Sequence, residues 1–489
     1  MAEVVVIGAG ATGLACAHAL KRAGVDVVCV ESAREPGGIM RSAKVGPYLF
    51  EAGPNTIPAS AATFRQLAGE AGIADRMQVS RKEASLRLIH RDGRLHPVPM
   101  RPADLLRTRL LSWPAKLRLA SEPLRRMRRV APHEPEPTLA AFMRERLGPE
   151  AATTLGGAFV RGVYAAELEE LGARSAFPRV FHLANDGGGL VRGMLRARRQ
   201  RETATKGAGG TATKGAGITA TKGPGQSPPG PATQRGDLLS FPNGLGELSL
   251  ALARGLTGSL LLGRGVVELE RGPQGWRVSL EDGADLQARV VVLTTSPADA
   301  HGLLALATPE RVDLDPLFQL PTGDLTVVHL GLSQPRIPPA FGFLVPPDQR
   351  PEDGAPRLLG ALFPSNIFSG RAPGGHATVS AIYRTGPEVS EAGQALETAR
   401  EDLRRGLGHE AGTVEAHRID TWRAVIPRYG VGHVERMEAL HTALRRALPG
   451  LVPAGTWTGG VSVEDRLKTG LAAATQARQL LRKPQEVPA

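Results

Sequence analysis

The residues best suited to chemistry stand near the start of the chain, where three glycines have the spacing of a dinucleotide-binding loop. They belong to the run Gly8, Ala9, Gly10, Ala11, Thr12 and Gly13. In such a loop the first glycine permits a tight turn, the second lets a pyrophosphate approach the backbone, and the third lets a helix pack closely. The N-terminus of the following helix offers N–H groups and a positive dipole to phosphates. We therefore predict that this loop binds the phosphates of a dinucleotide.

Two strands and a helix are needed to position that loop. Valine-rich apolar runs at 4–7 and 27–30 predict buried strands, and residues 12–23 predict a helix between them. Glu31 ends the second strand, where its carboxylate would accept hydrogen bonds from a ribose. This complete strand–helix–strand context favours a binding loop over a glycine-rich turn without a ligand.

The rest of the chain predicts other elements inserted into a nucleotide-binding fold. Further strands are expected at 277–280, 289–295, 325–330, 341–346 and 376–383. Helices are expected at 60–72, 138–147, 150–160, 246–256, 391–406 and 468–482. Strand–helix–strand comes first, then helices, then strands, then a final helix. This order indicates that other elements are inserted into the nucleotide-binding fold. Residues 201–235 contain an eight-residue repeat without large apolar side chains, so we expect a flexible low-complexity insertion there.

Composition sets limits on the class of protein. A chain of 489 residues with two cysteines is neither a disulfide scaffold nor a four-thiolate zinc protein. Cys16 and Cys29 lie in apolar surroundings and are expected to be small, reduced core residues. The histidines show no metal-ligand spacing, so no metal is expected. The first residues lack the features of a signal peptide and no apolar run reaches membrane-spanning length, so a cytoplasmic location is predicted.

A basic segment at 101–130 predicts contact with a membrane surface. It holds nine arginines and lysines against two acidic residues, with leucines and one tryptophan on helical spacing. Such a pattern is typical of an amphipathic segment on an anionic membrane, and the alternative is a solvated helix face. Nucleic acid is not expected as a partner, because the segment lacks aromatic side chains that would stack on bases.

A second pair of glycines follows the acidic strand end, and two other stretches accompany it. They are Gly37, Gly38, Ile39 and Arg41; Gly53, Pro54 and Asn55; and the run from Gly455 to Asp465. Together they resemble the amine-oxidase-like superfamily of FAD proteins. The resemblance implies one non-covalent FAD per chain, held by Gly8, Ala9, Gly10, Ala11, Thr12, Gly13, Glu31, Ser32, Gly37, Gly38, Ile39, Arg41, Gly53, Pro54, Asn55, Thr56, Val266, Gly460, Val461, Ser462 and Val463.

Five further stretches resemble the protoporphyrinogen oxidase family within that superfamily. They lie at 93–99, 157–166, 241–245, 341–346 and 426–433, and the last two are the most specific. The resemblance implies an oxygen-dependent, six-electron oxidation of protoporphyrinogen IX to protoporphyrin IX that yields hydrogen peroxide in haem synthesis. It also implies peripheral association with the inner face of the cell membrane, and it leaves open a homodimer and hand-over of product to the next haem-pathway enzyme.

The same resemblance implies a fold of mixed α/β and α+β class in three parts. A discontinuous Rossmann-like FAD-binding domain would comprise 1–80, 236–298 and 416–489. A mixed-sheet substrate-binding domain would comprise 81–98 and 299–415. A helical, membrane-associating domain would comprise 99–200, where the basic segment lies.

The resemblance also assigns substrate-binding residues, and no catalytic residue is assigned with them. Arg87 would bind a propionate, because its forked donors suit a carboxylate. An apolar wall would be formed by Phe341, Gly342, Leu344 and Ile382. The chain departs from the family at Glu464 and Arg466; an acid beside a flavin would oppose its anionic reduced form unless Arg466 pairs with it.

Three alternatives stay open. A coproporphyrinogen III oxidase on the same scaffold would need charge for two more carboxylates, which Arg41, Arg161 or Arg384 would supply. An amine oxidase or desaturase would need an aromatic cage, whereas aromatic residues make up 4% of the chain. A non-catalytic tetrapyrrole or flavin carrier would explain the altered stretch at 464–466.

Overall fold

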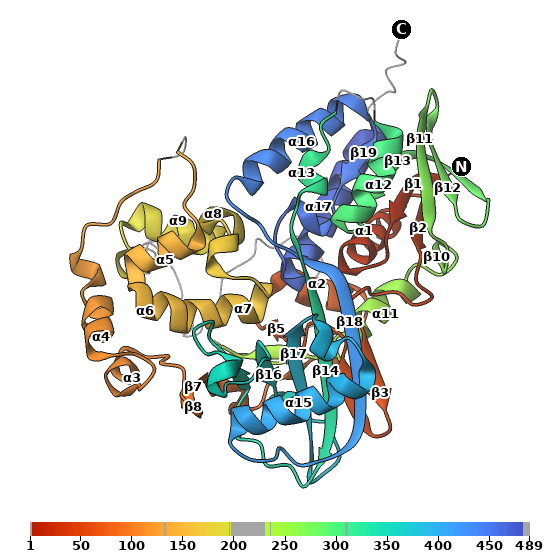
Figure 1. Cartoon of the computed structure of the whole chain (residues 1–489). Helices are drawn as coiled ribbons and strands as arrows, with labels where there is room; N and C mark the ends of the chain where they lie inside the picture. The colour runs from red at the N-terminus through yellow and green to blue at the C-terminus, as the bar shows by residue number, and fades with distance from the viewer. Residues whose placement is uncertain are drawn as a thin grey trace, which may run out of the picture.

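The computed structural model describes residues 2–131, 134–194, 196, 230–234, 236–308 and 312–482. Of the low-complexity insertion expected at 201–235, only 230–234 belong to the described residues, and the rest lies outside them. Within the described residues, the chain forms two large sheets and a separate group of helices (Figure 1).

The first sheet is mainly parallel and carries the N-terminal strand in its middle. Its order is β10-β2-β1-β13-β12-β11, and β19 pairs with β13. The parallel strands are β1 (Ala2–Ile7), β2 (Val27–Glu31), β10 (Leu260–Leu262), β13 (Asp285–Leu293) and β19 (Leu451–Pro453). β11 (Val266–Gly272) and β12 (Gly275–Leu280) add an antiparallel hairpin. The carboxyl ends of these five parallel strands, which come from distant parts of the chain, therefore meet at one edge of the sheet.

Helices cover both faces of the first sheet. They are α1 (Ala11–Arg22), α2 (Ala62–Glu70), α11 (Gly246–Arg254), α12 (Pro297–Ala307), α13 (Asp315–Phe318), α16 (His433–Ala447) and α17 (Val463–Arg482). α1 and α17 pack so closely that a Cβ added to Gly470 would lie only 2.4 Å from the carbonyl oxygen of Thr12. Cys16 and Cys29 are free and buried in this part of the molecule, as predicted.

The second sheet has the order β18-β14-β17-β16-β15-β7-β8. Its strands are β7 (Arg87–Arg91), β8 (Arg94–Pro97), β14 (Thr322–Ser333), β15 (Gly342–Leu344), β16 (Gly360–Leu362), β17 (His376–Arg384) and β18 (Thr413–Pro427). β15 and β7 are parallel, and the other pairs are antiparallel. α15 (Ala392–Leu407) covers one face of this sheet. The contact is close, because a Cβ added to Gly406 of α15 would lie 2.6 Å from the Phe343 ring.

The third part is helical and lies to the side of both sheets (Figure 1). It contains α3 (Pro102–Arg107), α4 (Trp113–Ala120), α5 (Leu139–Leu147), α6 (Pro149–Ala151), a π-helical turn (Ala152–Gly157), α7 (Ala158–Tyr164), α8 (Ala173–Ala176) and α9 (Pro178–Gly187). Its core includes Phe142, Tyr164 and Phe181. Smaller sheets pair β3 (Ser42–Val45) with β4 (Tyr48–Glu51), and β9 (Leu238–Ser240) with β5 (Ile57–Pro58) and β6 (Gln78–Val79).

The basic segment at 101–130 is less regular than its helical spacing predicts. It forms the short helices α3 and α4 and a 3-10 turn at Glu122–Leu124, with irregular backbone between them. Pro102, Pro114 and Pro123 each stand in the first turn of one of these elements, because proline fits a helix start and cannot continue a preceding helix. The described residues include no helix that is both long and apolar enough to cross a bilayer.

The predicted fold class is confirmed: a mixed α/β fold with a parallel nucleotide-binding sheet, a second mixed sheet and a helical part. The residue boundaries of the three proposed domains and the membrane role of the helical part stay predictions. β7 and β8, from 81–98, join the second sheet, and β18 (Thr413–Pro427) of the same sheet spans the proposed boundary between 415 and 416.

Candidate functional site

The glycine loop after β1 has the geometry that the sequence predicts. Gly8 has a φ of +100°, which favours glycine, and a Cβ on Gly13 would lie 1.8 Å from the Gly8 carbonyl oxygen. Gly10 is different, because a Cβ there would meet nothing within 4 Å. The fold itself therefore requires Gly8 and Gly13, whereas the space beside Gly10 is left free for a ligand. Ala11 and Thr12 form the first turn of α1.

Glu31 lies beside this loop at the carboxyl end of β2. Its carboxylate accepts hydrogen bonds from the backbone N–H groups of Ala9 (2.7 Å) and Ala33 (2.9 Å), which fixes its position. Ser32 donates to the same carboxylate. The N–H of Arg264 donates to the Glu31 carbonyl oxygen, so the strand that begins at Val266 starts next to Glu31. The structure thus brings Glu31, Ser32 and Val266 to one place.

The second pair of glycines lies directly against the first loop. Gly37 donates its N–H to the carbonyl oxygen of Ala9 at 2.7 Å, and Gly37 forms a parallel bridge with Gly10. Both glycines of the pair have positive φ values, +113° at Gly37 and +57° at Gly38. A Cβ on Gly38 would lie 3.3 Å from the Cα of Gly10. The two glycine motifs therefore form one continuous backbone surface.

The loop after β4 adds to this surface. The N–H of Ala52 donates to the carbonyl oxygen of Arg41, and a Cβ on Gly53 would lie 2.6 Å from the carbonyl oxygen of Ile39. Pro54, Asn55 and Thr56 follow as half-buried residues. The side chain of Ile39 is 38% exposed, which is unusual for a large apolar residue beside a buried core.

The C-terminal stretch reaches the same edge of the first sheet. β19 lies parallel to β13, so residues after Pro453 emerge where the glycine loop does. Ser462 caps α17 by accepting the N–H of Asp465 at 3.2 Å, and Val463 begins the helix. Tyr429 donates its hydroxyl to the Thr456 carbonyl oxygen at 2.6 Å and to that of Gly460 at 3.3 Å. Gly460 and Val461 are thus held in place by the stretch at 426–433.

Arg466 and Glu464 do not pair with each other. Glu464 instead accepts the N–H groups of Thr63 and Phe64, at 3.1 and 3.0 Å, and pairs with Lys468. These N–H groups begin α2, and a carboxylate is favourable at a helix N-terminus. Arg466 is buried and donates to the Gly455 carbonyl oxygen at 2.9 Å. The charge of Glu464 is therefore compensated without Arg466.

The residues at this edge fit a dinucleotide flavin. The fit rests on the free space beside Gly10, the adjoining backbone of Gly37 and Gly38, and the start of α1. Three buried polar atoms at this edge, Arg41 Nε, Asn55 Oδ1 and Thr295 Oγ1, have no hydrogen-bond partner among the described residues. These atoms are therefore available to polar groups of a ligand.

Four of the five predicted substrate residues lie on one face of the second sheet, and the fifth, Phe341, precedes β15. Residues paired across strands project to the same face, as do residues two apart along a strand. Arg87 pairs with Gly342, and Leu344 and Ile382 each pair with Gly360. The structure therefore brings these four predicted residues together, on the face opposite α15.

Leu362 belongs to the same face and was missed by the sequence analysis. It pairs with Gly342 on one side and Ser380 on the other. Leu344, Leu362 and Ile382 are all half-buried, although they lie in the middle of the sheet. Alternation along 360–362 is too short to identify a strand face, so only the pairing register reveals Leu362.

Arg87 stands at one edge of this face without an acidic partner among the described residues. Its guanidinium lies 5.1 Å from the ring centroid of Phe341. Burial lowers the pKa of Arg87, because a partly buried cation is poorly solvated. A half-buried guanidinium on an apolar face is suited to bind an anionic group of a ligand.

The face is joined to the loops that would hold the flavin. Trp422 Nε1 donates to the Ala52 carbonyl oxygen at 2.7 Å, and the Arg41 guanidinium lies 5.4 Å from the Trp422 ring. The Phe50 ring stacks at 5.3 Å on His329 of β14. These contacts place the substrate face next to the loop that contains Gly53.

A buried chain of Ser380, His329 and Asp420 was also missed, because its members come from three different strands. His329 Nδ1 lies 2.9 Å from Ser380 Oγ, and His329 Nε2 lies 3.4 Å from Asp420. His329 has no exposed surface and Ser380 is 1% exposed, so neither can reach a substrate. Burial lowers the pKa of His329, which favours a neutral ring under Phe50. This chain supports the wall and supplies no nucleophile.

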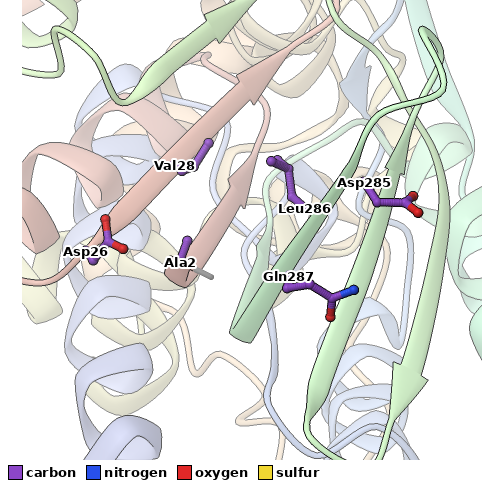
Figure 2. Close-up of a pocket in the computed structure, with 6 residues that line it drawn as sticks. All are labelled: Ala2, Asp26, Val28, Asp285, Leu286 and Gln287. Carbon is purple, nitrogen blue, oxygen red and sulfur yellow. The ribbon is translucent and has the colours of Figure 1, made fainter.

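Two cavities lie away from these residues. One, of about 370 Å³, is lined by Ala2, Asp26, Val28, Asp285, Leu286 and Gln287 (Figure 2). These residues begin β1, β2 and β13, so the cavity lies at the amino ends of the parallel strands. Ligands of such sheets bind at the carboxyl ends. The second cavity is lined by residues that include Arg94, Arg336 and Leu407, near α15. Neither is assigned a role here.

Comparison with protein families decides the class. The model of flavin-containing amine oxidoreductases matches residues 11–478. The chain belongs to this family. It is therefore a flavin-dependent oxidoreductase, as the cofactor loops predict.

Individual relatives cover nearly the whole chain. Human protoporphyrinogen oxidase is 30% identical over 96% of this chain and 97% of its own length. Coproporphyrinogen III oxidase of Propionibacterium freudenreichii is 31% identical over 95% and 88%. A crystal structure from Exiguobacterium sp. 255-15, provisionally described as a protoporphyrinogen oxidase, has a TM-score of 0.79 at 20% identity and covers 98% of each chain. The last similarity shows the fold alone.

Proposed function

We propose that this protein is an FAD-dependent oxidase that converts protoporphyrinogen IX to protoporphyrin IX, with one non-covalent FAD per chain. The observation that carries the proposal is Arg87, a half-buried guanidinium without an acidic partner among the described residues, at the edge of an apolar sheet face. An apolar macrocycle with propionates on one side matches a face of that kind. Human protoporphyrinogen oxidase supports the same substrate.

The chain's own residues would bind, orient and shield the substrate. When bound, FAD would accept two electrons at a time, and three rounds remove the six electrons and six protons of the reaction. Arg87 would bind a propionate and so fix the orientation of the ring. Leu344, Leu362 and Ile382 would contact the macrocycle and exclude water. The N-terminus of α17 would favour negative charge on the cofactor.

Molecular oxygen is the proposed acceptor. Three molecules of oxygen would take the six electrons and six protons and leave as three molecules of hydrogen peroxide. By register, His96, which pairs with Ile89, and His376, four residues before Ser380 on β17, also project to this face. We assign no catalytic acid or base.

Coproporphyrinogen III is the second candidate substrate, because a relative that is 31% identical bears that name. Two more carboxylates would need free cations. Arg161 and Arg384, however, are both paired with Glu167, at 2.9 and 3.0 Å. Arg41 lies 3.6 Å from Glu35. The available charge on the substrate face thus favours the substrate with two carboxylates.

We also propose that the protein lies on the inner face of the cell membrane through a surface of the helical part. The apolar members of this surface are exposed: Met100, Leu106, Trp113, Leu117 and Leu124, with exposed fractions of 63 to 83%. Basic side chains of 101–130 lie among them, and Lys116 Nζ is 4.5 Å from the Trp113 ring. Exposed apolar groups with adjacent cations suit an anionic membrane.

The decisive experiment follows porphyrin fluorescence in air with purified, flavin-loaded protein. Protoporphyrinogen IX and coproporphyrinogen III are supplied in parallel, and hydrogen peroxide is measured at the end. Faster oxidation of protoporphyrinogen, with one peroxide per two electrons, supports the proposal. Rates equal to autoxidation with both substrates would reject it and favour the carrier alternative.

A further inference from the structure

Five charged side chains form a compact cluster where the helical part meets the second sheet. We name it the arginine–glutamate cluster, and its members are Arg161, Glu167, Glu170, Arg384 and Arg428. They come from α7, the 3-10 turn Leu168–Glu170 and the residue before it, the end of β17, and the residue after β18. Arg161 and Arg384 are two of the arginines that, on the sequence alone, would supply charge for the extra carboxylates of coproporphyrinogen III.

The two glutamates hold all three arginines. Glu167 Oε1 accepts from Arg161 at 2.9 Å and from Arg384 at 3.0 Å. Glu170 pairs with Arg428, and its other oxygen lies 3.6 Å from Arg384. Arg384 also donates Nε to the Ala165 carbonyl oxygen at 2.9 Å. The side chains are partly buried, with exposed fractions between 19 and 37%, so the pairs are only partly screened by water.

The cluster adjoins the substrate face. Arg384 lies two residues beyond Ile382 on β17, and residues two apart project to the same face. Arg161 donates to the Pro346 carbonyl oxygen, just after β15. Its neighbour Gly162 is so close to Leu344 that a Cβ there would lie 2.7 Å from Leu344 Cδ2.

Arg87 and Arg384 occupy opposite corners of this face. β7 and β17 are separated by β15 and β16, which makes three strand spacings of about 4.8 Å, or about 14 Å across the sheet. Ser380 is the residue of β17 that lies in line with Arg87 across the sheet. Arg384 lies four residues from Ser380, which is a further displacement of about 13 Å along the strand direction. One corner thus offers a guanidinium without an acidic partner in the described part of the chain, and the other offers neutralised ones.

We propose that Glu167 and Glu170 determine substrate specificity by neutralising the cations at the far corner, so that the site accepts carboxylates only beside Arg87. This inference rests on the proposed function. Protoporphyrinogen carries its two propionates on neighbouring rings and apolar vinyl groups on the other two. Coproporphyrinogen carries a propionate on every ring, and its extra carboxylates would face Glu167 and arginines that are already paired. Desolvating those carboxylates without a free cation is unfavourable.

The test compares Glu167→Gln and Glu170→Gln with the wild-type holoenzyme. Glutamine keeps the size and one acceptor oxygen but releases the charge of the arginines. Glu169→Gln is the matched control, because Glu169 lies in the same turn and pairs with Arg144 outside the cluster. The readouts are the ratio of kcat/KM for coproporphyrinogen III to that for protoporphyrinogen IX, and the ratio of Kd values for the two porphyrin products, from fluorescence quenching.

We expect Glu167→Gln to raise the ratio of kcat/KM for coproporphyrinogen III to that for protoporphyrinogen IX about tenfold. The ratio of the Kd of coproporphyrin III to that of protoporphyrin IX should fall, and Glu169→Gln should behave as wild type. Ratios within twofold of wild type in both cluster variants would overturn the inference. So would a wild-type enzyme that already prefers coproporphyrinogen. If the wild type oxidises neither compound, the proposed function fails, and the Kd ratios still test the cluster.

A second variant separates charge from damage to the fold. In Glu167→Gln combined with Arg161→Met and Arg384→Met, both freed guanidiniums are removed again. The gain for the tetracarboxylate should then be lost, because it depends on these two arginines. A gain that persists in the combined variant would show that Glu167→Gln acts by loosening the site, which contradicts the inference.

Discussion

Gly10 and Gly37 form a parallel backbone bridge, so two glycine motifs from separate loops meet edge to edge at the carboxyl end of the first sheet. A Cβ on Gly38 would lie 3.3 Å from Gly10 Cα, whereas a Cβ on Gly10 itself would point into open space. The protein therefore keeps a glycine at position 10 for something other than its own packing. Gly38 is thus needed for the close approach of the two loops, whereas Gly10 is needed for cofactor binding.

Replacing Gly10 with valine should abolish flavin retention and leave the apoprotein folded. The backbone at Gly10 has a φ of −73°, which valine can adopt, and no protein atom lies within 4 Å of its Cβ. The flavin absorbance of the purified variant and the Tm of the apoprotein are the measurements. Gly13→Ala is the comparison, and it should instead lower the apoprotein Tm, because its Cβ would lie 1.8 Å from the Gly8 oxygen. A Gly10→Val protein that purifies with full flavin would contradict the role of the loop.

Replacing Arg87 with alanine should raise KM for protoporphyrinogen by about ten- to a hundredfold, since a charge-assisted pair with a carboxylate contributes about 1.5–3 kcal/mol. Steady-state kinetics with flavin content measured in parallel would check this. Arg87→Lys should recover part of the loss. Arg94→Ala, an exposed arginine on β8, is the control and should behave as wild type. An unchanged KM in Arg87→Ala would remove Arg87 from the substrate site.

Replacing both Trp113 and Leu117 with glutamate should weaken binding to vesicles of phosphatidylcholine and phosphatidylglycerol by at least tenfold. Both side chains are more than 60% exposed, and burying such groups contributes about 1.5–3 kcal/mol each. Vesicle cosedimentation at several salt concentrations is the measurement. Leu306→Glu, on exposed α12, controls for an added charge elsewhere. Equal cosedimentation of all three proteins would argue against a membrane surface at 100–124.

Acid should destabilise the protein partly through His433. Burial lowers the pKa of His433 to about 4, and its ring stacks 4.5 Å from that of Tyr429. The unfolded chain, with a histidine pKa near 6.5, binds the proton first as the pH falls. The stabilising effect is thus complete above about pH 6.5 and is lost as the pH falls towards 4.

Denaturant unfolding between pH 7 and 4 should show this contribution. His433→Phe keeps an aromatic ring and removes the proton site, so its free energy of unfolding should fall less over this interval, by on the order of 2–3 kcal/mol. His409→Gln, at an exposed position, should follow the wild-type profile. Parallel profiles for wild type and His433→Phe would show that this ring does not titrate as its burial predicts.

Local signals predicted much of the fold. The strands β1 and β2, the helix α1 between them, and the long helices α15 and α17 appear near their predicted positions, because each carries its own hydrophobic period and turn residues. The glycine loops could likewise be placed, since glycines at fixed spacing report local backbone geometry.

The features that sequence reasoning missed depend on pairing between distant segments. Leu362 joins the substrate face only through the register of β15, β16 and β17. Glu464 meets the first turn of α2, which lies at the other end of the chain. Register follows from the whole sheet and its core rather than from any short window of sequence, so partners of this kind cannot be read locally.

The position of β1 in the middle of the first sheet also has a consequence during synthesis. β1 pairs with β13, so β1 waits for residues 285–293 to be synthesised before its central neighbour exists. At about 5–20 residues per second, that delay is roughly 15–60 s. The stretch around Gly460 is synthesised later still, so a nascent chain cannot complete its cofactor cradle until that stretch has left the ribosome. Flavin capture would therefore follow the synthesis of all these segments and lock the assembled strands in place.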